Sequence, residues 1–85
     1  MMTTLDKIRP GMGGIIQSVG GQGALRRRLL DMGLTPKTKI QVTKIAPMGD
    51  PMELYLRGYV LTLRLQDAAE IEVLVKEEVQ LALHS

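Results

Sequence analysis

Short segments in which every second residue is apolar constrain this chain more than any other feature. Apolar and polar residues alternate over residues 39–46, 52–57, 60–65 and 71–76. Because successive side chains of a β-strand point to opposite faces, each segment predicts a strand with one face on a core. Residues 13–19 are rich in Ile and Val and predict a further strand. Five short strands joined by tight turns predict a mainly β fold, arranged as a small closed or nearly closed barrel.

One short helix is predicted between the first and second of these strands, over residues 24–32. Its apolar side chains follow the spacing of an α-helix, at Leu25, Leu29 and Met32. Gly33 comes next and suits the left-handed conformation that ends many helices. Upstream, residues 1–12 are expected to form a lead-in with a single helical turn.

The chain length of 85 residues predicts one domain over residues 1–85. Within it, Val79, Leu81 and Leu83 occupy alternate positions of residues 77–85, which favours an extra edge strand, and the alternative is a frayed tail. The chain has no cysteine, which fits a reducing compartment. No stretch approaches the roughly 20 apolar residues of a membrane span. We therefore expect a cytoplasmic protein.

Residues that carry out catalysis or bind metals are scarce. The only histidine, His84, lies next to the last residue, where a side chain is rarely held firmly enough for acid–base chemistry. The lack of cysteine excludes thiolate ligands and thiol nucleophiles. The nine acidic residues are scattered along the chain. We therefore predict no enzyme activity, no catalytic residue and no metal-binding residue.

Three features are candidates for contact with a partner. Three consecutive helical residues span about 200°, so the three arginines at 26–28 cannot all face one partner. The arginines are compatible both with contact to an anionic partner and with a helix face exposed only to solvent. The loop 47–51 carries Met48 between two prolines, so docking would cost little entropy, although a plain hairpin connection fits equally well. The two tyrosines complete the set. The candidate partner-binding residues are Arg26, Arg27, Arg28, Pro47, Met48, Gly49, Asp50, Pro51, Tyr55 and Tyr59.

Five segments also form an ordered set of motifs between about residue 5 and residue 75. They are residues 5–11 (LDKIRPG), 28–36 (RLLDMGLTP), 46–51 (APMGDP), 61–64 (LTLR) and 69–73 (AEIEV). With these motifs the chain resembles the FeoA family, small accessory proteins of bacterial ferrous iron transport. The chain departs from the family at Lys37, where glycine is usual, and in residues 79–85, which extend past the usual end.

The resemblance implies an SH3-like β-barrel that acts as a cytosolic accessory and regulatory module of ferrous iron uptake. It implies one partner, the cytosolic domain of the membrane GTPase-transporter that imports ferrous iron, so that any link to the membrane is indirect. No cofactor is required, although weak association with Fe²⁺ or another divalent transition metal is attributed to the family. Assembly into a homo-oligomer is compatible with the sequence.

Two alternative functions stay open at this point. The first is a transition-metal-binding regulator or iron chaperone, and the second is a nucleic-acid-associated SH3-like domain, suggested by a pI near 9.2. The net charge is only +2, and the chain has two aromatic residues on which bases could stack. We therefore expect no nucleic-acid partner.

Overall fold

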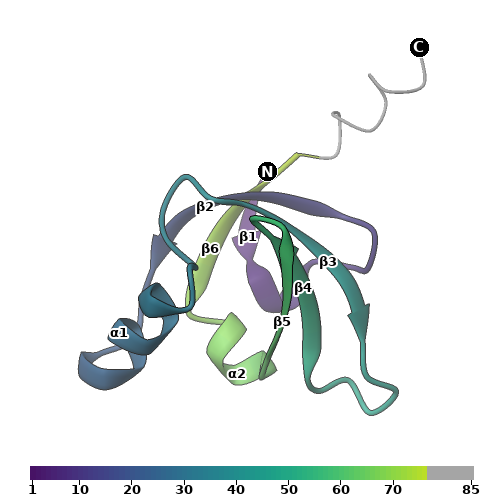
Figure 1. The fold of residues 1–85 in the computed structure, drawn as a ribbon. Helices are drawn as coiled ribbons and strands as arrows, with labels where there is room; N and C mark the ends of the chain where they lie inside the picture. Colours follow the sequence, from purple (N-terminus) through teal and green to yellow (C-terminus); the bar gives the residue numbers. More distant parts are fainter. Residues whose placement is uncertain (77–85) are drawn as a thin grey trace.

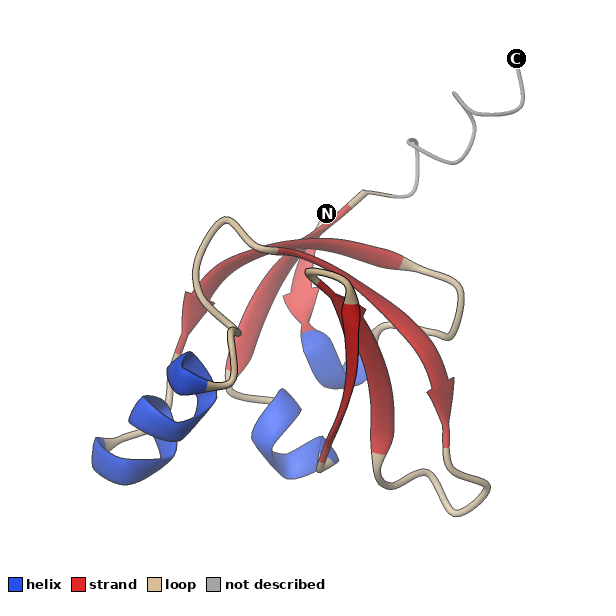
Figure 2. Ribbon diagram, viewed as in Figure 1, coloured by secondary structure: helices blue, strands red, loops and turns tan. Residues whose placement is uncertain are grey.

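The computed structural model describes residues 1–76, and strands are its main regular elements (Figure 1, Figure 2). The strands are β1 (Met2–Thr4), β2 (Gly13–Val19), β3 (Lys39–Ile45), β4 (Met52–Leu56), β5 (Tyr59–Leu63) and β6 (Ile71–Val75). The helical elements are the 3₁₀ turn η1 (Leu5–Lys7) and the helices α1 (Gly23–Asp31) and α2 (Leu65–Ala68). The five predicted strands and the predicted helix are confirmed, with ends displaced by at most two residues.

The six strands form one antiparallel sheet in the order β1-β6-β2-β3-β4-β5, which curls around the core (Figure 1). The expectation of about five strands missed β1, which pairs Met2–Thr4 with Glu72–Leu74 of β6. Three residues are too few to show an alternating pattern, and β1 depends on its pairing with β6. The alternatives considered for residues 77–85 lie outside the described residues.

The core lies on the inner face of the sheet, as the alternation predicts. The inward residues of β4 and β6 are all buried, namely Met52, Leu54, Leu56, Ile71, Val73 and Val75. Strands β2 and β6 approach so closely that a Cβ atom on Gly14 would lie 2.2 Å from the carbonyl oxygen of Leu74. A glycine is therefore required for this strand pairing.

The end of α1 follows from the residues after it. Gly33 has a φ of +97°, and its amide donates to the carbonyl oxygen of Leu30 at 3.0 Å. The amide of Leu34 donates to the carbonyl oxygen of Leu29 at 3.2 Å, and both leucine side chains are fully buried. This is a Schellman motif with its apolar contact, and it confirms the predicted role of Gly33.

Candidate partner-binding surface

The three consecutive arginines of α1 have three different surroundings. The Nε of Arg26 donates to the carbonyl oxygen of Val19 at 3.1 Å and ties the helix to the end of β2. Arg28 forms an ion pair with Asp67 of α2, with 3.0 Å between Nη2 and Oδ2. Arg27 is exposed, and its side chain enters none of the hydrogen bonds or ion pairs found within residues 1–76. Of the three arginines, Arg27 is therefore the most available for an external contact.

Helix α2 contacts both α1 and the loop that carries Met48. The backbone amide of Leu65, the first residue of α2, donates to Oδ1 of Asp50 at 2.9 Å. Arg64 lies 3.6 Å from Oδ2 of the same carboxylate. Because Asp67 of α2 also pairs with Arg28, α1, α2 and residues 46–51 lie along one side of the molecule, the lower side in Figure 1. We call these three elements the helical face.

The helical face has an apolar projection beside mixed charges, because its three arginines are matched by three aspartates, Asp31, Asp50 and Asp67. Met48 is 92% exposed, at the tip of a loop closed by two backbone hydrogen bonds, from the amide of Ala46 to the carbonyl of Pro51 and from the amide of Gly49 to the carbonyl of Ala46. Pro47, Asp50 and Pro51 are exposed, whereas Gly49 is half-buried. The side chains of Arg28 and Arg64 keep 61% and 74% of their surface accessible in spite of their ion pairs. This face therefore combines accessible cations with one exposed apolar side chain.

The two tyrosines lie on opposite faces of the β4–β5 hairpin. Tyr59 pairs with the inward-facing Leu56, and its hydroxyl donates to the carbonyl oxygen of Met32. Arg57, beside it in the turn, donates from Nη2 to the hydroxyls of Thr35 and Thr38 at 3.0 and 2.8 Å. We call Arg57 and Tyr59 the hairpin clamp, because they hold the connection between α1 and β3.

Tyr55 belongs to the outer surface. It pairs with Val60, and the two side chains are 46% and 53% exposed. The ten candidate residues therefore fall into three places: the helical face, the inner side of the hairpin tip and the outer side of the same hairpin.

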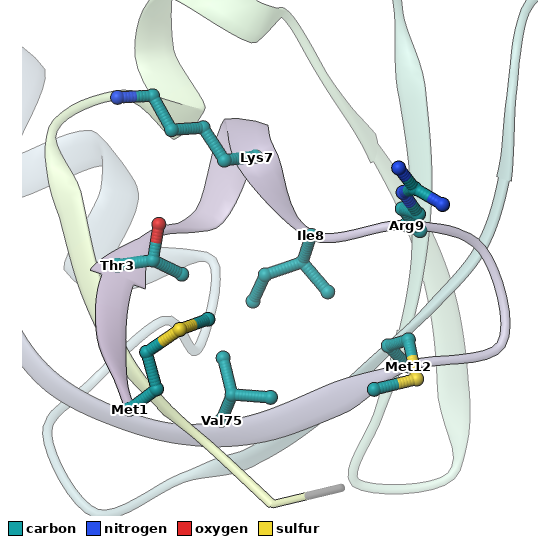
Figure 3. Close-up of a pocket in the computed structure, with 7 residues that line it drawn as sticks. All are labelled: Met1, Thr3, Lys7, Ile8, Arg9, Met12 and Val75. Carbon is teal, nitrogen blue, oxygen red and sulfur yellow. The ribbon is translucent and has the colours of Figure 1, made fainter.

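A groove of about 190 Å³ opens on another part of the surface (Figure 3). Met1 and Met12 approach it from opposite sides, with Ile8 and Val75 between them, and Lys7 and Arg9 complete the lining with Thr3. None of the ten candidate residues lines this groove. A second hollow, of about 290 Å³, lies beside the helical face and is lined in part by Pro47 and Pro51.

Among residues 1–76 there is no group of three His, Cys, Asp or Glu side chains placed to hold a metal ion. Within the same residues, no helix has the length and apolar character needed to cross a membrane.

Sequence reasoning missed three residues that shape these surfaces. Asp67 and Arg57 act through contacts with residues far along the chain, so no local pattern marks them. Val60 left a signal, because it is an apolar residue at an outward position of an alternating strand. An apolar side chain on the polar side of such a pattern indicates exposed apolar surface.

The fold and its surfaces define a small SH3-like barrel with exposed arginines and exposed apolar side chains. The FeoA domain family matches residues 3–75, and the chain belongs to this family of ferrous iron transport. A relative from Porphyromonas gingivalis, a fusion of Fe(2+) transport protein A with the Fe(2+) transporter FeoB, is 38% identical over 69 residues. The match covers 81% of this chain and only 8% of that relative.

Solved structures agree with this assignment. The crystal structure of an iron uptake regulatory protein, FeoA, is 30% identical, with a TM-score of 0.82 over 89% of this chain and 100% of the other. The FeoA of Stenotrophomonas maltophilia, described as a procaryotic SH3 domain protein, is 20% identical, with a TM-score of 0.73. It covers 89% of this chain and 92% of its own, and at this identity the likeness concerns the fold.

Proposed function

We propose that this chain is a cytoplasmic accessory module that binds the cytosolic domain of a ferrous iron GTPase-transporter and acts by binding, without catalysis. The observation that carries the proposal is the Porphyromonas gingivalis fusion, in which a FeoA-like segment and a FeoB transporter share one polypeptide. Two domains joined in one chain meet at a high effective concentration, which suits partners that function together.

The helical face is the proposed contact surface. Arg27 supplies a cation that is free of internal partners among the described residues, and Met48 supplies an exposed apolar side chain. Arg28 adds a cation that stays accessible beside Asp67, and Arg64, directly before α2, adds another beside Asp50. Cationic side chains around an apolar contact favour fast, salt-dependent association with an acidic surface.

A direct binding measurement tests the proposal. The chain is titrated by calorimetry into the isolated cytosolic domain of the ferrous iron transporter of the same organism, without nucleotide, with GDP and with a non-hydrolysable GTP analogue. We expect binding at tens of micromolar or tighter in at least one of these states. Arg27→Glu and Met48→Asp should each weaken it by about tenfold, in the range of interface hot spots.

Arg9→Glu is the matched control, because it reverses an exposed arginine that lies between η1 and β2, outside the helical face. It should leave the affinity within about twofold, and circular dichroism should show that all three variants remain folded. If no nucleotide state binds at tens of micromolar, direct contact is refuted. If Arg9→Glu weakens binding as much as Arg27→Glu does, the assigned surface is wrong.

A further inference from the structure

Strand β5 forms an open edge of the sheet. It ends the strand order and pairs with β4 alone among the described strands. The opposite edge, β1, has only three residues and so offers little to another strand. β5 has five residues, Tyr59–Leu63, with neither a charged side chain nor a proline among them. Two usual features that protect an edge strand, a charged side chain and a proline, are therefore missing from β5.

The hairpin geometry determines which backbone groups face outward. Arg57 and Gly58 form the two-residue turn, with φ values of +50° and +86°, as in a type I′ hairpin. In such a hairpin the residues flanking the turn, here Leu56 and Tyr59, form a hydrogen-bonded pair. The amide and carbonyl groups of alternate residues then point the other way. Val60 and Thr62 therefore direct their backbone donors and acceptors away from β4.

Apolar surface accompanies this edge. Val60 and Tyr55 are neighbours on the outer face of the hairpin and are 53% and 46% exposed. Thr62 is also exposed. An added strand could cover these side chains while it pairs with the backbone of Val60 and Thr62. Such addition of a strand to a sheet edge is a common mode of peptide recognition.

Charges at the two ends of β5 indicate what would bind. Arg57 precedes the strand and contacts only threonine hydroxyls, so no carboxylate of the described residues neutralises it. Arg64 follows the strand, and although it lies 3.6 Å from the Asp50 carboxylate, 74% of its side chain stays exposed. Two copies paired antiparallel through β5 would place the arginines of one copy next to those of the other, which is repulsive. An extended segment with acidic ends complements them.

We propose that β5 is a docking site for an extended acidic segment of a partner protein, which adds to the sheet by pairing with Val60 and Thr62. This site adjoins the helical face at Arg64, but its backbone contacts, at Val60 and Thr62, lie outside that face. It stands or falls independently of the transporter contact proposed above.

The test uses nuclear magnetic resonance on the full chain and a synthetic probe. The probe is an acetylated and amidated hexapeptide, Glu-Thr-Val-Thr-Val-Glu, and its matched control carries lysine at both ends. We expect the acidic probe to bind with a dissociation constant on the order of 1 mM, typical of a few hydrogen bonds without a pocket. The amides of Val60 and Thr62 should shift and gain protection from hydrogen exchange. The lysine peptide should bind at least about fivefold more weakly.

Two variants locate the site. Thr62→Pro removes the outward amide and should abolish binding, whereas Thr62→Val keeps the amide and should preserve it. If Thr62→Pro does not fold, Val60→Glu serves instead, because it places a negative charge on the edge and should weaken the acidic probe about tenfold. Arg27→Glu, on the helical face, should change nothing.

Three results would overturn the proposal. The first is the absence of chemical-shift changes at the amides of Val60 and Thr62 with 10 mM probe, about ten times the expected dissociation constant. The second is protection of both amides in the free chain at every protein concentration, which means that the edge is already closed. The third is protection that rises with protein concentration together with a dimer in sedimentation, which assigns the edge to a second copy of this chain.

Discussion

Replacement of Gly33 by alanine tests how the end of α1 and the hairpin clamp depend on each other. Alanine at position 33 would place a Cβ atom on a backbone with a φ of +97°, which lowers the free energy of unfolding by about 1–2 kcal/mol. Its Cβ would also lie 2.6 Å from the hydroxyl oxygen of Tyr59, which is too close for any real contact. The ring must move, and the hydrogen bond from Tyr59 to the carbonyl of Met32, worth about 1 kcal/mol, is lost.

The expected total is a loss of about 2–3 kcal/mol in the free energy of unfolding, the sum of the backbone and hydrogen-bond effects. For a domain of this size that corresponds to a fall in Tm on the order of 10–20 °C. Urea unfolding followed by circular dichroism measures the free energy directly. Gly49→Ala is the matched control, since Gly49 has a φ of +91° but a Cβ there meets nothing within 4 Å. It should show the backbone effect alone.

Tyr59→Phe separates the two contributions. The single variant loses the hydrogen bond and should cost about 1 kcal/mol. In the double variant the hydroxyl is absent, and the nearest atoms to the new Cβ lie at ordinary contact distances of 3.7 and 3.8 Å. Because the hydrogen bond can be lost only once, the double variant should be about 1 kcal/mol more stable than the sum of the singles predicts. Additive effects, or a Gly33→Ala cost no larger than that of Gly49→Ala, would refute the reasoning.

Three further predictions concern stability. Lys37 has a φ of +76°, which strains a residue with a side chain, so Lys37→Gly should raise the free energy of unfolding by about 0.5–1 kcal/mol, as measured by urea unfolding. A loss of stability would contradict the strain argument. Gly14→Ala should lower the free energy of unfolding by about 3 kcal/mol, because the added Cβ meets the Leu74 carbonyl oxygen at 2.2 Å. If the variant is as stable as the wild type, β2 and β6 are farther apart than this. A double-mutant cycle on Arg28 and Asp67 should give a coupling of about 0.5–1 kcal/mol at low salt, which fades in 1 M NaCl; a salt-independent coupling would rule out an exposed ion pair.

The candidate surface was only partly predictable from sequence. Helical geometry alone shows that consecutive arginines face different directions. Which of them is occupied depends on Val19 and Asp67, residues that α1 meets only after the chain has folded. In the same way, the predicted loop residue Asp50 turns out to bind the start of α2, a contact across 15 positions of the chain.

Local sequence patterns were enough to predict the strands β2 to β6, their inward faces and the glycine at the end of α1. These follow from local rules, since alternation and a left-handed cap involve residues only a few positions apart. Tertiary structure alone decided that β1 is a strand, that Arg57 and Tyr59 hold the connection after α1, and that β5 is left as an edge. Each of these depends on which segments meet in space, and pairing between distant segments leaves no periodic trace in either partner.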